Sequence, residues 1–386
     1  MHKRIIVLFS VILFIACNNA NAQSIYGDFP FFESFLTTTP SSDVKRPVPT
    51  SNLGIVNKAR FSTDGLHLTA DALTQFGAIY IDNHKITAKN GVLIEFEYMA
   101  YGGSGGDGIS FFLFNANEQN PGIGASGAGI GYSYNRSIID GGTFNRHRAR
   151  GLPSGFVGIA FDSYGNFKGR RYQGESRVNG IYDRDYINGS SQADFEAGSE
   201  VTIRGAARES PMSVNMDDSG TAIQGMGIGY CGYPLLLTQQ TKKNVGFVLE
   251  SNSSTDIKYT RKDQSMAKSS FTIRGGKYFE KSTDPGYRKA FVELWPNGTD
   301  AFFIDVIIQH ESGKDTIIYN YDYDTEFYYR ENARPAVPHT ANGITYGNSH
   351  GDLNPVDYAH YADHIRKLSI SVPVELKIGF AAATGT

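Results

Sequence analysis

In the stretch AFFIDVIIQH, residues 301–310, every second side chain from Phe302 to Ile308 is apolar, and the polar residues Asp305 and Gln309 lie on the other face. The apolar side chains on one face are those of Phe302, Ile304, Val306 and Ile308. A period of two is typical of a β-strand that is buried on one side. The same alternation occurs in GVLIEFEYMAY, residues 91–101, and in LSISVPVELKIGF, residues 368–380. Each stretch predicts a half-buried strand, so strands are expected along the chain.

The composition also favours strands and turns over helices. The 386 residues include 43 glycines and 23 tyrosines, and turn-rich segments separate the alternating stretches. No stretch has the amphipathic pattern of a helix of about 12 residues or more. Two packed antiparallel sheets bury half-apolar strands economically. We therefore predict an all-β fold, an antiparallel two-sheet sandwich, in one domain over residues 23–386.

The first residues, MHKRIIVLFSVILFIACNNANAQ, have the pattern of a secretory signal. A basic start is followed by an apolar run that ends at Cys17 and by the small-residue site Ala20-Asn21-Ala22. The run is shorter than the ~20 residues that a membrane-spanning helix needs. We predict a signal peptide over residues 1–22 and an exported protein without a transmembrane segment, extracellular or on the cell surface. Two routes stay open: conventional cleavage, or lipoprotein anchoring through Cys17.

Charge and motif context argue against two classes of function. Lys and Arg total 36 against 39 Asp and Glu, and no basic run could neutralise a row of phosphates, so nucleic acid is not expected as a partner. The segment GGSGG, residues 102–106, matches a nucleophile elbow but leads into a strand rather than a helix. No strand carries the paired carboxylates of a sandwich-fold glycosidase. An enzyme is therefore not expected.

Oxygen-bearing groups follow the apolar strand of GFVGIAFDSYGNF, residues 155–167. The Asp162 carboxylate, the Tyr164 carbonyl and the Asn166 side-chain oxygen are spaced as calcium ligands can be at a strand end. The alternative is an Asx-type turn, in which Asp162 and Asn166 satisfy their own backbone. Taken alone, this stretch favours the turn.

Three further loops favour a ligand site. Asp107 lies between glycines in GGDGISFFLF, residues 105–114, where a carboxylate can accept two sugar hydroxyls. GAGIGYSY, residues 127–134, has backbone N–H groups that side chains do not obstruct, and KIGFAAATG, residues 377–385, adds another small-residue loop. We expect these loops and the one after Asp162 to converge on one rim.

In this order the four loops resemble those of the L-type lectins, the legume-lectin-like group of the concanavalin A-like fold, especially its large bacterial surface members. The resemblance spans nearly the whole mature chain. It implies a jelly-roll sandwich that binds a glycan or polysaccharide through calcium-organised loops. It also implies that Asp107, Gly129, Tyr164 and Asn166 bind carbohydrate, and that Asp162, Tyr164 and Asn166 bind calcium.

Several positions depart from the family pattern or stay open. Ala160 stands where the family has a glutamate ligand, so the second, transition-metal site is expected to be absent. The family's further acidic calcium ligand has no clean counterpart in this sequence, so calcium affinity is expected to be weak. The backbone N–H donor is Gly129 or Gly131, and the bond Gly106–Asp107 is expected to be cis. The family continues into a final strand after the AAATG loop, so this strand is expected to be cut off. Candidates for the fourth, acidic calcium ligand are Glu175, Asp183 and Asp185.

The leading interpretation is an exported, lectin-like carbohydrate-binding module, typical of a bacterial cell surface. Asp107, Asn166 and an N–H near Gly129 would hold hydroxyl groups while the Tyr164 ring packs on an apolar sugar face. The main alternative is a surface adhesion or structural sandwich without sugar binding, because fold does not guarantee function. A polysaccharide-degrading enzyme is the less favoured third reading. The sugar and the oligomeric state are not predicted.

Overall fold

The structure is a computed structural model. It describes residues 29–48, 56–103, 106–119, 121–133, 135–140, 147–149, 151–165, 167–168, 198–208, 231–251, 257–277, 280–298, 301–331, 339–341, 344–346 and 364–385. The predicted signal peptide, residues 1–22, and Cys17 lie outside these ranges. Within them, no helix has the length and apolar character that crossing a bilayer requires.

Strands and turns make up nearly all of the described residues. The helical elements among them are two 3-10 turns, η1 (Ala88–Asn90) and η2 (Gly127–Gly129). All paired strands within the two main sheets are antiparallel. The predicted all-β antiparallel sandwich is confirmed.

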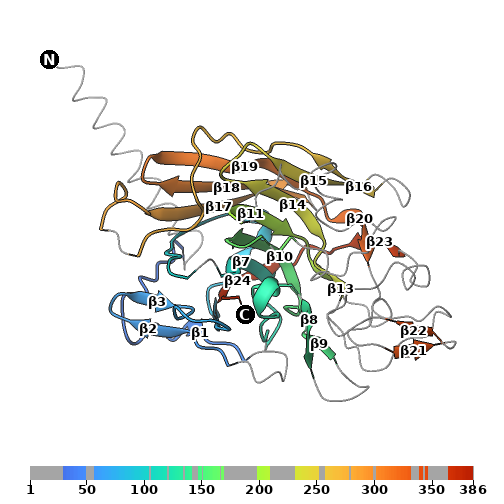
Figure 1. The fold of residues 1–386 in the computed structure, drawn as a ribbon, viewed down its shortest axis with the longest axis horizontal. Coiled ribbons are helices and arrows are strands. Elements are labelled where there is room, and N and C mark those ends of the chain that lie inside the picture. Colours follow the sequence, from blue (N-terminus) through green and yellow to red (C-terminus); the bar gives the residue numbers. More distant parts are fainter. Residues whose placement is uncertain are drawn as a thin grey trace.

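The larger sheet holds the strands that position the site. Its order is β1 (Val44–Lys45), β4 (Phe76–Ile81), β24 (Glu375–Ala383), β7 (Gly108–Asn115), β10 (Gly155–Asp162), β11 (Glu200–Arg204), β14 (Leu235–Gln240), β15 (Gly246–Ser251) and β16 (Ile257–Arg261), with β5 (Ile86–Thr87) beside β24. The last long strand, β24, therefore lies between two strands from the first third of the chain. Figure 1 shows this arrangement, with β24, β7 and β10 side by side.

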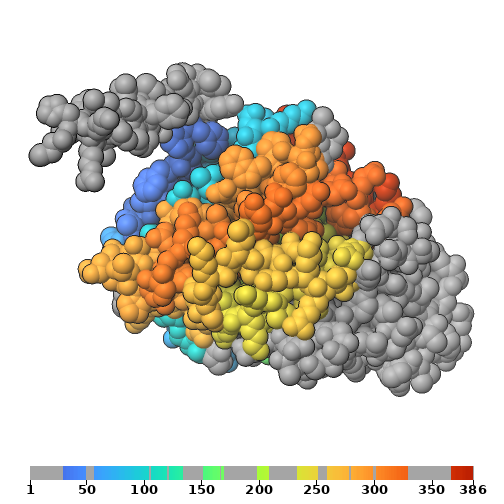
Figure 2. All heavy atoms as spheres, turned by 90° about the horizontal axis from the view of Figure 1, so that it is seen from above, coloured from blue at the N-terminus to red at the C-terminus, as the bar shows by residue number. Residues whose placement is uncertain are grey.

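A four-stranded sheet forms the second layer. Its order is β19 (Gly313–Tyr323), β18 (Ala301–His310), β17 (Arg288–Asn297) and β6 (Val92–Glu97). In Figure 1 this sheet lies above β7 and β10. From above, orange residues of β17 to β19 lie beside yellow residues of β14 to β16, so the far end of the larger sheet curves up to the second layer (Figure 2).

Short two-stranded sheets surround these layers. Their strands are β2 (Arg60–Ser62) with β3 (Gly65–His67), β8 (Asn135–Asp140) with β9 (His147–Ala149), β12 (Ala207–Arg208) with β13 (Cys231–Gly232), β20 (Glu326–Glu331) with β23 (His364–Ser369), and β21 (His339–Ala341) with β22 (Ile344–Tyr346). The hairpin of β2 and β3 packs against the β1 and β4 side of the larger sheet through Phe61 and Leu66.

The main core lies between the two layers. Every second residue of β18 is buried, from Phe302 to Ile308, as the alternation of residues 301–310 predicts. These side chains pack against the inward faces of β7 and β10, including Phe111 and Ile159. Burial of a large apolar side chain contributes about 1.5 to 3 kcal/mol, so this layer contact is the main source of stability.

Strand β10 is buried on both faces, which explains why its sequence is apolar without alternation. The second face is covered by Tyr132, whose ring lies so close to Gly158 that a Cβ atom there would come within 2.2 Å of it. The Tyr132 hydroxyl donates to the Gly205 carbonyl at 2.9 Å. The segment after η2 is therefore fixed to the outer face of the larger sheet, against the middle of β7 and β10.

The single strand expected over residues 368–380 is wrong. Strand β23 ends at Ser369, β24 begins at Glu375, and the two belong to different sheets. Val374 is 75% exposed. Pro373 has no N–H to donate to a neighbouring strand, which disfavours a continuous central strand here.

Candidate functional site

Three of the predicted loops adjoin the ends of neighbouring strands on the same side of the larger sheet. The register pairs Gly108 of β7 with both Ala383 of β24 and Asp162 of β10. Asp107 directly precedes Gly108, and its carbonyl accepts the Ser163 N–H at 3.1 Å. The loops that carry Asp107, Tyr164 and Thr384 therefore adjoin, because strand pairing brings their starting points together.

These loops border one cavity of about 2110 Å³. Its lining includes Asp107, Tyr164, Gly127 and Thr384, one residue from each of the four predicted loops. The Tyr164 side chain is 59% exposed, whereas Asp107 is only 3% exposed. The structure thus brings the predicted loops to one rim, with an accessible aromatic ring beside a largely buried carboxylate.

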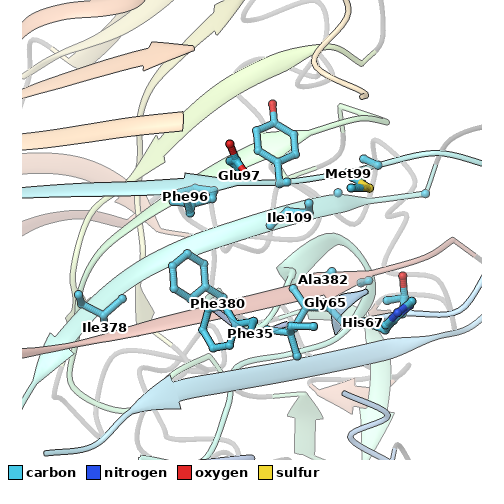
Figure 3. A pocket seen from close by; sticks show the side chains of 18 of the residues that line it. Phe35, Gly65, His67, Phe96, Glu97, Met99, Ile109, Ile378, Phe380 and Ala382 are labelled. Carbon is cyan, nitrogen blue, oxygen red and sulfur yellow. The ribbon is translucent and has the colours of Figure 1, made fainter. Parts of the chain in front are cut away.

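The same cavity continues as an apolar cleft between the two layers. Phe96 of β6 and Phe380 of β24 both line it and pack against each other, with ring centroids 5.0 Å apart in a T-shaped arrangement. Figure 3 shows this pair, with Ile109 on the Phe96 side and Phe35 next to Phe380. One end of the cavity is therefore polar, at Asp107, and the other is apolar.

The loop with η2 supplies the two candidate backbone donors. The Gly131 N–H donates to the Ala125 carbonyl at 2.7 Å, whereas the Gly129 N–H makes a longer bond of 3.4 Å to the Ser126 carbonyl. Gly131 also has a φ of +73°, and a Cβ there would lie 2.4 Å from the Ala381 side chain, so its role is close packing. Of the two, Gly129 has the weaker N–H hydrogen bond, but Gly129 is buried and, unlike Gly127, is not among the residues that line the cavity.

Some predicted site residues cannot be placed. Asn166 lies outside the described residues, as do all three candidates for the fourth calcium ligand, Glu175, Asp183 and Asp185. The Gly106–Asp107 bond is not cis; among the described residues the cis peptide bond is Phe29–Pro30. The expectation of a cis bond before Asp107 is therefore wrong.

Asp162 ends β10 and is fully buried. Its Oδ1 accepts the N–H groups of Tyr164 at 3.1 Å and Gly165 at 2.6 Å, and its Oδ2 accepts the N–H of Phe167 at 2.8 Å. Burial raises the pKa of Asp162 to about 6, although nearby Lys168 and the N–H donors oppose this rise. This is the Asx-type turn of the alternative interpretation, and it fixes the loop that presents Tyr164.

Two residues that the sequence analysis missed lie beside Asp162. Glu200 of β11 is its Cα partner across the sheet and is fully buried. The Lys168 ammonium donates to Glu200 Oε1, and the Thr238 hydroxyl donates to Oε2 at 3.3 Å. Burial raises the pKa of Glu200 to about 7, against the opposing effect of Lys168. The sequence does contain a signal for this pair. Glu200 begins the apolar stretch EVTI, and a charged side chain in a buried strand needs a buried partner.

The described residues around Asp162 do not fit a calcium ion. Calcium takes six to eight oxygen ligands, among them open carboxylate oxygens. Both Asp162 oxygens here accept backbone N–H groups, and the positive charge beside them is an ammonium group. Within the described part of the chain, no three His, Cys, Asp or Glu side chains gather as a metal site would require.

Comparison with known proteins gives likeness of fold only. No family model matches the chain, and no curated protein sequence matches it. The chain is similar to the solved VIP36 exoplasmic/lumenal domain in its Ca2+/Man-bound form, with 9% identity, a TM-score of 0.33, and coverage of 90% of this chain and 78% of that chain. For the metal-free form of that domain, the identity is 10% and the TM-score 0.32, and the match covers 89% of this chain and 87% of that chain.

A peanut lectin solved with a nine-residue peptide is similar to a comparable degree. The identity is 12% and the TM-score 0.34, and the match covers 92% of this chain and 89% of that chain. Similarity as low as this says nothing about individual site residues. The function must therefore be inferred from the geometry of the rim itself.

Proposed function

We propose that the protein binds a glycan or polysaccharide at the polar end of the cavity, as a lectin-like module. The observation that carries the proposal is that the exposed Tyr164 and the acidic Asp107 both line one cavity. A sugar offers an apolar C–H face and a ring of hydroxyl groups. An exposed aromatic ring and a carboxylate fixed beside it match these two surfaces.

Each residue has a distinct role in this proposal. The Tyr164 ring packs on the sugar face, and the Asp107 carboxylate accepts hydrogen bonds from two neighbouring hydroxyls. The Gly129 N–H donates to a sugar oxygen, which its long bond to Ser126 leaves possible. Asn166 follows Tyr164 by two residues, and we propose it as a further hydroxyl-binding group on the same loop.

Cellular location and calcium are separate parts of the proposal. The leader sequence supports an exported protein, with lipoprotein anchoring through Cys17 as the variant route. A bacterial cell surface is proposed from the resemblance to the bacterial surface lectins. Calcium at Asp162, Tyr164 and Asn166 stays a prediction of the resemblance, which the geometry at Asp162 does not favour. The sugar-binding proposal does not depend on the metal, because the Asp162 turn is already closed by hydrogen bonds.

A glycan array with the wild type and two matched tyrosine variants tests the proposal. Tyr164→Ala removes the ring at the cavity. Tyr319→Ala removes a ring that is 54% exposed on β19 and does not line the cavity. We expect the wild type and Tyr319→Ala to bind the same glycans and Tyr164→Ala to lose them.

Two outcomes of the array would count against the proposal. If no glycan binds the wild type, the alternative of an adhesion or structural domain gains support. If Tyr164→Ala binds as the wild type does, the site lies elsewhere. Measuring release of reducing sugar ends from bound polysaccharides would reveal the enzymatic alternative.

A further inference from the structure

Lys168 places a positive charge inside the loop that follows β10. Its side chain is 10% exposed, and its ammonium is paired with Glu200, whose side chain is fully buried. Asp162, the Cα partner of Glu200, is equally buried. Two buried carboxylates on adjacent strands would repel each other strongly without a compensating cation.

The loop backbone folds closely around this ion pair. Gly165 has a φ of +93°, and a Cβ atom at this position would lie 3.0 Å from the Lys168 Nζ and 3.2 Å from Glu200 Oε1. On the other side, a Cβ atom at Gly198 would lie 2.2 Å from the Ser163 carbonyl oxygen. On one side of Tyr164, Gly165 is thus packed against the ion pair, and on the other side Ser163 is packed against Gly198.

An ammonium group meets the requirements of this centre. It is a compact charge with three donors, and it is already attached to the loop that it orders. A calcium ion would need oxygen ligands, but three N–H groups point at the Asp162 carboxylate. The partial positive charges of these N–H groups replace part of the electrostatic stabilisation that a metal ion would give the carboxylate.

We propose that Lys168 is a built-in cation, which orders the loop 162–168 through Glu200 and Asp162 in place of a calcium ion. The loop then presents Tyr164 in the same position whether or not calcium is present. This inference concerns the order of the loop, so it can fail or succeed independently of the proposed glycan binding.

The test compares Lys168→Met with a matched control, Lys377→Met. Lys377 is also buried and ion-paired, with its Nζ 2.6 Å from Asp82, but it lies near the opposite end of β24 from the cavity rim. Each protein is studied in EDTA and in about 10 mM CaCl2, a level well above the dissociation constants of weak extracellular calcium modules, about 0.1 to 1 mM. The measurements are the melting temperature and the hydrogen exchange of peptides that contain the Gly165 and Phe167 amides.

For the wild type, we expect equal melting temperatures and equal amide protection in EDTA and in CaCl2. Lys168→Met should lose protection at Gly165 and Phe167 and melt roughly 10 °C lower, because removing one partner leaves buried carboxylates uncompensated. Lys377→Met should also melt lower but keep these amides protected. The loss of protection therefore separates the loop from general destabilisation.

Two results would overturn the inference. One is a wild type whose melting temperature or amide protection rises with calcium and falls with EDTA. The other is a folded Lys168→Met protein that protects the Gly165 and Phe167 amides as the wild type does. If Lys168→Met does not fold, the comparison of the wild type in EDTA and CaCl2 still decides the question.

Discussion

Asp162 of β10 and Glu200 of β11 are Cα partners across the larger sheet, and both are fully buried. Directly beyond this pair, the chain leaves β10 to form the loop that carries the exposed Tyr164. The buried charges and the accessible ring are thus parts of one short segment. The stability of this segment and its capacity to bind a ligand should respond together to changes at Asp162.

Replacing Asp162 with asparagine should destabilise the protein by about 1 to 3 kcal/mol. In the wild type, the Phe167 N–H donates to Oδ2 of Asp162. The asparagine amide keeps one acceptor oxygen, but its NH2 group would face this N–H and could not accept from it. Urea unfolding at pH 7 measures the change in the free energy of unfolding. A variant as stable as the wild type would contradict the hydrogen bonding described for this turn.

Replacing Asp107 with asparagine should weaken glycan binding by roughly tenfold or more, the effect of losing a charge-assisted hydrogen bond to a hydroxyl. The backbone carbonyl that accepts the Ser163 N–H is kept, so the rim should keep its shape. Titration with a glycan identified on the array gives the affinity, and thermal unfolding checks the fold. Unchanged affinity in the folded variant would remove Asp107 from the site.

Replacing Gly158 with alanine should destabilise the protein by about 1 to 3 kcal/mol or more, the cost of overpacking a core. The new Cβ would lie 2.2 Å from the buried Tyr132 ring, which must move with the segment after η2. Gly385→Ala is the control, because no atom lies within 4 Å of its added Cβ. Equal melting temperatures for the two variants would refute the close packing of Tyr132 on β10.

The acid stability of the protein should depend on Asp315. Burial alone would raise its pKa, but the Ser269 hydroxyl, the Lys268 N–H and His310 outweigh burial and hold the pKa below the usual 3.8. A carboxylate with a lowered pKa stabilises the fold above its unfolded-state pKa and loses this contribution as pH falls through the folded-state value. Asp315→Asn should therefore be less stable than the wild type at pH 7.

The difference between the two proteins should shrink as the pH is lowered below about 4, where the unfolded carboxylate becomes protonated. Urea unfolding of both proteins at several pH values from 7 to 3 measures this difference in the free energy of unfolding. A stability difference that is constant over this range would show that Asp315 acts through its shape rather than its charge.

The sequence predicted the layers of this fold better than the details of its site. The alternation in residues 301–310 and 91–101 predicted strands correctly, because half-buried strands carry their pattern locally. Pro373 interrupted the third alternating stretch, where the pattern alone predicted one strand. The convergence of Asp107 and Tyr164 on one cavity was also predicted. Asp107 directly precedes the apolar strand β7, Tyr164 follows the apolar strand β10, and these two strands pair.

The environment of Asp162 was not predictable from local spacing. Its partner Glu200 belongs to another strand, and the register that aligns the two is set by the whole sheet. Lys168 lies only six residues after Asp162, but whether a lysine points to solvent or into a buried ion pair depends on packing. The spacing of oxygen atoms allowed both a calcium site and an Asx-type turn, and the hydrogen bonds that Asp162 accepts are those of the turn.

The position of β24 between β4 and β7 has a consequence for how the chain folds. Ala383 pairs with Phe76 on one side and with Gly108 on the other, so both contacts join residues that lie far apart in the sequence. Until β24 has been synthesised, β4 and β7 each have an unpaired edge, and such edges invite pairing with other chains. With its central contacts this far apart in sequence, the sheet should close slowly.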